Sequence, residues 1–232
     1  MRLGIMQPYF LPYIGYFQLI AAVDTFIVYD NIKYTKKGWV NRNRLLVNGS
    51  DTIFSLPLKR GADSLDVAQR ELAASFDRQK LLNQFRGAYG CAPQFDQVYP
   101  VLERVIQHSE VNLFGYIYYS IMQFCEYLEI KTKIEISSGM AIDHTVKGQD
   151  KVLALCRATG ATTYINAIGG TGLYAKDSFR NQGVNLRFLK AKPFVYSQFS
   201  AAFVPWLSIV DVLMFNPLNK VRACINENYE LI

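Results

Sequence analysis

Short apolar runs alternate with stretches of helical spacing at the start of the chain. Residues 3–6 form an apolar run, and the two prolines within residues 7–12 prevent a helix from passing through that turn. Apolar side chains recur at helical spacing over residues 13–23, and residues 24–30 have the pattern of a buried strand. This order of elements predicts a βαβ unit with parallel strands and a right-handed crossover.

A similar alternation returns after a long helical section. Residues 52–59 have a strand pattern, and helical periodicity then dominates, with long runs at 76–90 and 99–128. Beyond these runs the pattern predicts strands at 133–140, 162–168 and 184–191, a helix at 147–161 closed by Gly160, and a helix at 204–215.

The composition is that of a folded α/β protein. Half of the residues are hydrophobic and 19% are charged, which excludes a disordered chain and a coiled coil. No internal repeat or low-complexity linker is visible. We therefore expect residues 1–232 to form a single α/β domain, with a mostly parallel Rossmann-like sheet, flanking helices and a helical insertion at about 75–130.

The net charge of +6 is concentrated in one segment. Residues 31–50 contain no acidic residue and five basic ones, namely Lys33, Lys36, Lys37, Arg42 and Arg44. The rest of the chain is therefore nearly neutral. A local excess of this kind indicates a site for one anionic ligand, and it argues against a surface that binds nucleic acid.

The cysteines and the N-terminus indicate the cellular compartment. The four cysteines are widely spaced, and neither they nor the two histidines have metal-ligand spacing, so we expect reduced thiols and no bound metal. Pro8 and Pro12 interrupt the first apolar run before a signal sequence could form, and no stretch approaches the roughly 18 apolar residues of a membrane span. These features predict a soluble cytoplasmic protein without a transmembrane segment.

The turn at residues 7–12 is a candidate ligand loop. It follows a predicted strand, at the edge where ligands collect on open parallel sheets. Gly15 allows the backbone to approach a neighbouring group closely. The candidate binding residues here are Gln7, Tyr9 and Tyr16. The alternative is a rigid turn whose aromatic side chains only pack.

The basic segment carries the groups that bind a phosphate-bearing ligand. Arginine and lysine side chains bind phosphate, and Trp39 has a flat face on which a sugar or base would stack. Asn41 and Asn43 would orient polar groups of the ligand. The candidate phosphate-binding residues are Lys33, Lys37, Arg42 and Arg44. The alternative is a solvated charged loop, although such loops usually mix both signs of charge.

Two residues are candidates for a general base. Asp30 ends the second predicted strand beside the basic segment, whose cations are expected to lower its pKa and so weaken it as a base. His144 lies next to Asp143, and Lys147 follows at the start of a predicted helix, where it would neutralise an anion. The alternative for the residues around His144 is ordinary helix capping.

The strand at 162–168 leads into a second candidate loop. Asn166, Gly169, Gly170 and the nearby Tyr174 are its candidate binding residues, at the same sheet edge as residues 7–12. The glycine pair does not match a GxGxxG fingerprint, and the chain has no Walker loop, GxSxG elbow or HExxH motif. None of the cysteines lies in a cationic motif, so a thiolate nucleophile is not expected.

Four ordered segments of the chain resemble the WbqC-like family: residues 6–46, KGQDKVLALC, TYINAIGGTGLY and LSIVDVLMF. The central residues 60–135 carry no matching motif. The resemblance implies an association with O-antigen and other surface-polysaccharide biosynthesis, and the transfer of glycine or another acyl group onto a sugar. It adds weight to a shared site of Gln7, Pro8, Asp30, Lys37, Trp39, Asn41, Arg42, Asn43, Lys147, Gly169, Gly170 and Tyr174.

Together these observations predict a transferase that attaches an acyl or aminoacyl group, for example glycyl, to the amine of a nucleotide-linked amino sugar. The co-substrate would be a thioester of coenzyme A or of an acyl carrier protein, with no tightly bound cofactor. One alternative is a nucleotidylyl or adenylate-forming transferase, and another is a non-catalytic module that binds a sugar nucleotide or a carrier protein. Tyr116, Tyr118 and Tyr119 indicate either a homodimer surface or core packing.

Overall fold

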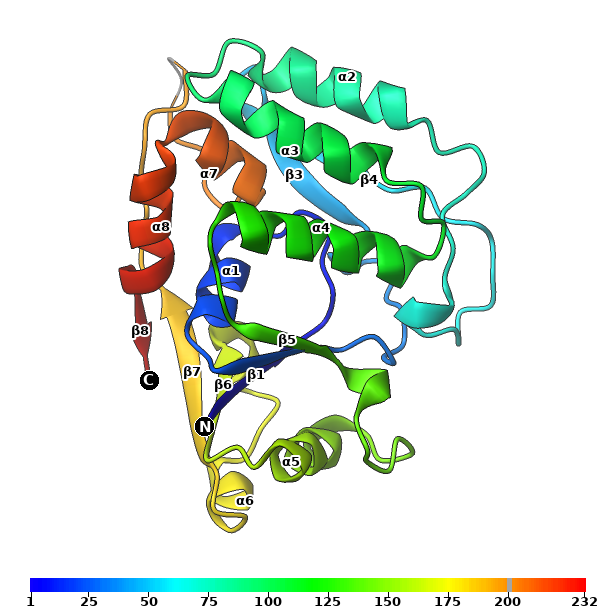
Figure 1. Cartoon of the computed structure of the whole chain (residues 1–232), viewed down its shortest axis with the longest axis vertical. Coiled ribbons are helices and arrows are strands. Elements are labelled where there is room, and N and C mark those ends of the chain that lie inside the picture. Colours follow the sequence, from blue (N-terminus) through cyan, green and yellow to red (C-terminus); the bar gives the residue numbers. More distant parts are fainter. Residues whose placement is uncertain (200–201) are drawn as a thin grey trace.

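The computed structural model describes residues 1–199 and 202–232, and a six-stranded sheet lies at its centre (Figure 1). In spatial order the strands are β5 (Lys133–Ile136), β2 (Thr25–Val28), β1 (Arg2–Met6), β6 (Thr163–Ala167), β7 (Asn185–Ala191) and β8 (Tyr229–Leu231). All neighbouring strands are parallel except β7 and β8. This arrangement confirms the predicted α/β class with a mostly parallel sheet.

The chain reverses its direction across the sheet at β1. From β1 it passes through α1 (Ile14–Ala21) to the parallel strand β2, as the βαβ pattern predicted. It later returns from β5 to β6, which pairs with the other edge of β1. Numbered along the chain, the strands of this sheet follow the order 3-2-1-4-5-6, which is the order of dinucleotide-binding α/β folds.

Helices cover both faces of the sheet (Figure 1). One face carries α5 (Gly148–Thr159) and α6 (Lys176–Arg180). The other face carries α1, α4 (Leu113–Tyr127), α7 (Ile209–Phe215) and α8 (Leu218–Glu227). Because both faces are covered, the middle residues of the central strands are buried, and so are all four residues of β2. Gly160 ends α5 in the left-handed conformation, with a φ of 68°, as predicted.

The helical section contains α2 (Arg78–Tyr89), α3 (Phe95–Gln107) and α4. The prediction of one helical run over 99–128 is wrong, because the chain breaks between α3 and α4. The Glu110 carboxylate accepts the backbone N–H groups of Val111 and Asn112 at 2.7 and 2.8 Å. The Asn112 side chain then caps α4 by accepting the N–H of Gly115 at 3.0 Å. These local hydrogen bonds compete with a continuous helix.

The aromatic residues of α4 differ in their surroundings. Tyr116 is fully buried and its hydroxyl donates to the Ile106 carbonyl at 2.9 Å, so it belongs to the core. Tyr118 is half-buried, and Tyr119 stacks on the His108 ring with centroids 3.7 Å apart. A homodimer surface on this helix would therefore exclude Tyr116.

A separate antiparallel hairpin, β3 (Arg42–Val47) and β4 (Ser50–Ser55), packs against the helical section (Figure 1). The basic segment is therefore not a loop throughout, which corrects the sequence interpretation, and the strand predicted at 52–59 ends at Ser55. In β3, Asn43 and Leu45 are buried while Arg42 and Arg44 are partly exposed. Asn48 and Gly49 form the turn with positive φ values, as a tight hairpin turn requires.

The remaining elements complete the sheet edge and the rim. The sequence pattern did not predict the ten-residue helix α8, nor the short elements α6 and β8. Three single-turn helices lie at η1 (Val67–Gln69), η2 (Ser137–Gly139) and η3 (Ile168–Gly170). In the two described ranges, no helix has both the length and the apolar character needed to cross a membrane.

Candidate functional site

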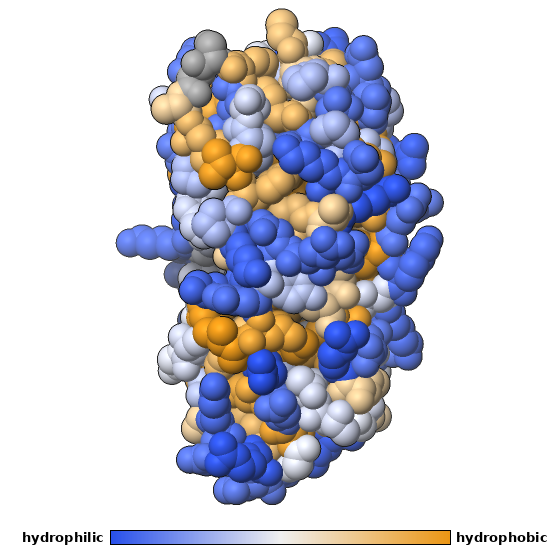
Figure 2. Space-filling view, turned by 90° about the vertical axis from the view of Figure 1, so that its left-hand side faces the viewer, coloured by the Kyte–Doolittle hydropathy of each residue, from blue (hydrophilic) through white to orange (hydrophobic). Residues whose placement is uncertain are grey.

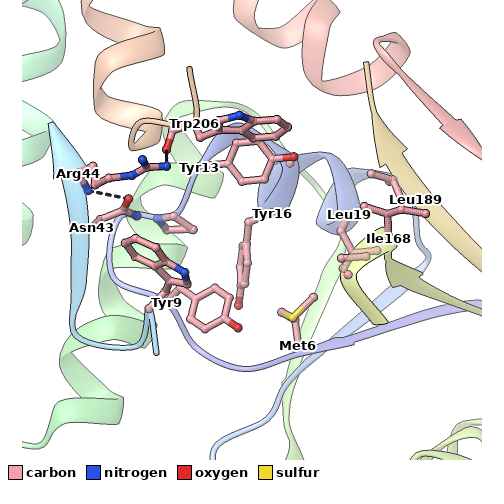
Figure 3. A pocket seen from close by; sticks show the side chains of 15 residues that line it. Met6, Tyr9, Tyr13, Tyr16, Leu19, Asn43, Arg44, Ile168, Leu189 and Trp206 are labelled. Carbon is pink, nitrogen blue, oxygen red and sulfur yellow. Dashed lines mark hydrogen bonds between the residues drawn. The ribbon is translucent and has the colours of Figure 1, made fainter. Parts of the chain in front are cut away.

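An apolar-walled cavity lies at the carboxyl ends of β1 and β6, where the strand order reverses. Ligands of open α/β sheets bind in the crevice at this position. The cavity, here called the main cavity, has a volume of about 410 Å³ (Figure 3). The side chains that form its walls include Met6, Tyr9, Tyr13, Tyr16, Leu19, Trp39, Asn43, Arg44, Ile168, Leu189 and Trp206.

Three tyrosines from the turn after β1 and from α1 surround the main cavity (Figure 3). The Tyr16 hydroxyl donates to the Gln7 carbonyl at 3.0 Å, which fixes the turn to the helix. Burial raises the pKa of Tyr9, and burial together with the nearby Cys224 raises the pKa of Tyr13 to about 12. The hydroxyls of Tyr9 and Tyr13 form no hydrogen bond with any residue in the described ranges. They are therefore neutral hydrogen-bond donors that a ligand can use.

Gly15 permits the close packing of the Tyr13 ring. A Cβ atom at Gly15 would lie 2.0 Å from the Tyr13 hydroxyl oxygen and 2.2 Å from the ring carbon that bears it. Tyr13 also contacts Trp206, with ring centroids 5.6 Å apart. The sequence predicted that a neighbouring group lies close to the Gly15 backbone, and in the structure this group is the Tyr13 side chain.

Gly15→Ala is expected to displace the Tyr13 ring and weaken binding in the main cavity at least tenfold. The free energy of unfolding should change by no more than about 1 kcal/mol, because alanine favours the helix by about that amount. Ligand titration and thermal melting measure the two effects. In a Tyr13→Ala background, Gly15→Ala should have no further effect on affinity, and an additive loss would contradict this explanation.

Asn43 connects the hairpin to the turn after β1. Its side-chain amide donates to the Leu11 carbonyl at 2.7 Å and to the Phe10 carbonyl at 3.3 Å. Its side-chain oxygen accepts the backbone N–H of Arg44 at 2.8 Å (Figure 3). Leu11 has a φ of 46°, which is uncommon for a residue with a side chain. The buried Asn43 thus holds this turn in an unusual conformation.

Arg44 and Trp39 form the wall of the main cavity that comes from the basic segment. Arg44 donates to Asp51 and to the Trp206 carbonyl, both at 3.0 Å. Its Nε atom is buried and has no partner in the part of the chain that the structure describes. The guanidinium carbons of Arg44 and Arg42 both lie 5.5 Å from the Trp39 ring centroid. This wall therefore combines a cation, an unpaired donor and an aromatic face.

The other predicted residues of the basic segment lie outside the main cavity. Arg42 donates to the Gly38 carbonyl at 2.9 Å and also to the Lys37 carbonyl, so it stabilises the turn that carries Trp39. Asn41 accepts the Tyr34 hydroxyl at 2.8 Å and donates to the Leu56 carbonyl at 2.7 Å. Lys33 and Lys37 are exposed and do not line the cavity. The structure thus brings Trp39, Asn43 and Arg44 together and places the others apart.

The two candidate bases lie in a second group at the same rim, on the α5 face of the sheet. Asp30 is 3% exposed, and its carboxylate accepts the backbone N–H of Ser138 at 2.9 Å. The His144 ring lies 2.9 Å from the Asn31 side-chain amide and 3.0 Å from the Met140 carbonyl. Neither Asp30 nor His144 lines the main cavity, and Lys147 is exposed just before α5. Their roles stay predictions.

Sequence reasoning missed a buried lysine in this second group. Lys151 is 3% exposed, and its ammonium lies 4.8 Å from the Tyr29 ring centroid and 3.5 Å from the Asn31 carbonyl. Burial lowers the pKa of Lys151, although Asp30 and Asp66 oppose this shift. Lysine is usually exposed, so nothing in the sequence distinguished this one.

The loop after β6 separates the two groups. Gly169 lines the main cavity. A Cβ atom at Gly170 would lie 2.3 Å from the Asn166 side-chain nitrogen, so this glycine allows the loop to fold over Asn166. Tyr174 packs edge-on against Tyr164, with centroids 5.7 Å apart. In the described ranges no three His, Cys, Asp or Glu side chains gather as metal ligands would.

Other residues of the main cavity were also missed. Tyr13 lies between Tyr9 and Tyr16 in the sequence. The cluster of aromatic residues there could have identified it as a candidate binding residue. Trp206 had no such signal, because it reaches the cavity from a segment nearly 200 residues away in sequence.

Comparison with known proteins identifies the family. An uncharacterized protein of Mycobacterium tuberculosis is 27% identical over 221 residues, which cover 93% of this chain and 93% of that protein. The WbqC-like protein family matches residues 7–223, a range that includes the turn after β1, the hairpin and the loop after β6. The match extends over nearly the whole chain, and the chain therefore belongs to the WbqC-like protein family.

Proposed function

We propose that this protein is a transferase that attaches an acyl or aminoacyl group to the amine of a nucleotide-linked amino sugar. The observation that carries the proposal is the position and lining of the main cavity. It lies at the reversal of strand order, and its walls are aromatic with a few polar groups. Nucleotide and cofactor sites have this position and this character.

The wall from the basic segment supports a ligand that carries phosphate. Arg44 has a fixed orientation because Asp51 and the Trp206 carbonyl hold its guanidinium. This guanidinium lines the main cavity, so an anionic ligand there would lie beside a positioned cation. Trp39 is 41% exposed and offers its ring to a base or sugar.

The free tyrosine hydroxyls support acyl transfer in the same cavity. In this reaction the sugar amine attacks the thioester carbonyl carbon, so that an N–C bond forms and negative charge develops on the carbonyl oxygen. The C–S bond then breaks, and the proton lost by nitrogen passes to the leaving thiolate, which gives an amide and a free thiol. Tyr13 stays protonated at neutral pH, because its pKa is about 12, and would donate a hydrogen bond to the developing charge.

Calorimetric titration with UDP-, dTDP- and GDP-linked amino sugars tests the binding step, with the corresponding nucleoside diphosphates as controls. At least one nucleotide sugar should bind more tightly than its nucleoside diphosphate. Mass spectrometry of mixtures with acyl thioesters should then detect the N-acylated sugar. Failure of every nucleotide sugar to bind would contradict the proposal. Binding without product from any thioester would favour a binding module, and pyrophosphate release from ATP or CTP with magnesium would favour a nucleotidylyl transferase.

A further inference from the structure

A second cavity of about 150 Å³ lies behind the main cavity. Tyr13 and Trp206 line both cavities, so this aromatic pair is the partition between them. The second cavity is formed mainly by the segment that follows β7, with Ile14 and Val212 from helices on the same face. On the side of the molecule that carries β7 and α8, hydrophobic residues reach the surface among hydrophilic ones (Figure 2).

The wall of the second cavity is apolar. Its lining includes Ile14, Phe194, Val195, Phe203, Leu207 and Val212. Among the described residues that line it, only Lys192 carries a charge. The Asp211 carboxylate, which is next to the lining residue Val212, already accepts hydrogen bonds from Tyr89, Tyr196 and Gln198. An ammonium group in this cavity would therefore find no free counter-charge.

The partition is suited to movement of one side chain. Trp206 is 61% exposed and its backbone has a φ of 62°, while its carbonyl is held by Arg44 at 3.0 Å. The indole can therefore change its rotamer while the backbone stays fixed to the hairpin. Such a rotation would join the two cavities beside the Tyr13 hydroxyl.

Two cations lie at the outer side of the second cavity. Lys192 is part of its lining, and the Lys220 ammonium lies 5.4 Å from the centroid of the Phe194 ring. Neither lysine forms a salt bridge with an acidic residue in the described ranges. These cations would repel an ammonium group in the chamber, which again disfavours an aminoacyl donor.

We propose that the second cavity holds the acyl group of the donor, and that this donor is a thioester of a short, apolar acid. This inference rests on the proposed function and narrows it, because an apolar chamber selects against a glycyl or other aminoacyl group. The cavity of about 150 Å³ has room for a short acyl chain. The thioester carbonyl would lie at the partition, beside Tyr13 and the sugar amine.

Calorimetric titration with two matched donors tests this assignment. Butyryl-coenzyme A and β-alanyl-coenzyme A have acyl groups of similar length, but the second ends in an ammonium group. Butyryl-coenzyme A should bind at least tenfold more tightly than β-alanyl-coenzyme A, and about tenfold more tightly than acetyl-coenzyme A, because it buries two more methylene groups. Equal affinities for the three thioesters would overturn the assignment.

Ala191→Leu places bulk in the second cavity and should remove the preference for the butyryl group. Ala158→Leu makes the same change at an exposed position of α5 and should retain it. Should Ala191→Leu fail to fold, Val195→Trp, at a position that is 67% exposed, blocks the same cavity from outside. A butyryl preference that survives in the folded blocking variant would also overturn the assignment.

Nucleotide-sugar titrations of the same proteins separate the two proposals. Ala191→Leu should leave nucleotide-sugar affinity unchanged, because Ala191 does not line the main cavity. If the wild type binds no nucleotide sugar but prefers the butyryl thioester, the proposed function is contradicted and the donor assignment is not. Nucleotide-sugar binding with no butyryl preference would contradict the donor assignment alone.

Discussion

Asp211→Ala is expected to lower the free energy of unfolding by about 3 to 5 kcal/mol, because it leaves several buried donors without an acceptor. Asp211 is fully buried in α7 and accepts the hydroxyls of Tyr89 and Tyr196 at 3.0 and 2.6 Å. It also accepts the side-chain amide of Gln198 at 2.7 Å. These bonds join α7 to α2 and to the segment that carries Trp206. Denaturant unfolding measures the loss.

Asp177→Ala is the matched control for this prediction. Asp177 is exposed in α6 and pairs with Arg180 at the surface, where ion pairs contribute little, so its loss should be within about 0.5 kcal/mol. A loss at Asp211 as small as that at Asp177 would show that water replaces the carboxylate and that the network is not essential to the fold.

The pH dependence of stability provides a second readout at Asp211. Burial raises the pKa of this carboxyl above its ordinary value of 3.8, and the hydrogen bonds from Tyr196, Gln198 and Tyr89 only partly oppose that shift. A raised folded-state pKa means that the contribution to stability is complete below pH 3.8 and is lost as the pH rises through the raised value. The difference in unfolding free energy between the wild type and Asp211→Asn should therefore change over this interval. A constant difference would contradict the shift.

Arg44→Ala is expected to weaken binding of the nucleotide sugar about 30-fold, since a hydrogen bond to a charged group contributes about 2 kcal/mol. The guanidinium lines the main cavity, and Asp51 and the Trp206 carbonyl hold it in place. Arg44→Lys should recover only part of the affinity, because lysine keeps the charge but lacks the planar fork. Calorimetric titration measures each affinity, and melting curves confirm that the variants are folded.

Arg42→Ala is the matched control for Arg44. Both guanidinium groups lie 5.5 Å from the Trp39 ring centroid, but only Arg44 lines the main cavity. Arg42→Ala should therefore reduce affinity less than Arg44→Ala and do so by loosening the turn at residues 37–42. Equal losses would mean that the whole basic segment attracts the ligand by charge and that the cavity wall has no special role.

The parts of the fold that follow from a simple hydrophobic period were predictable. The first βαβ unit, the end of α5 at Gly160 and the strands β6 and β7 all have such patterns. The strand β3 was not recognised, because its inward-facing positions include the polar Asn43. Its outward-facing positions carry Arg42 and Arg44, and this cluster of charges is typical of a loop. The Asn43 amide is buried because it donates to backbone carbonyls of another segment, and a polar residue at a buried position breaks the alternation of apolar and polar residues that indicates a strand.

The sequence predicted the parts of the candidate site whose positions follow from the order of strands and helices along the chain. The rim position of the turn after β1 and of the loop after β6 followed from the order of the elements. The sequence did not tell on which face of the sheet each group lies, and so it grouped Asp30 with Trp39 and Arg44. The structure places Asp30 beside Ser138 of η2 and near Lys151 of α5, away from the main cavity.

The shared wall of the two cavities has a consequence for how two bound ligands change each other's affinity. The Trp206 carbonyl is tied to Arg44, and its indole packs on Tyr13, so a ligand on either side acts on the same aromatic pair. If a ligand in one cavity changes affinity in the other by some factor, thermodynamic linkage requires the reverse effect to have the same factor. Any such coupling would pass through the aromatic rings of Tyr13 and Trp206, because Arg44 holds the Trp206 backbone in place.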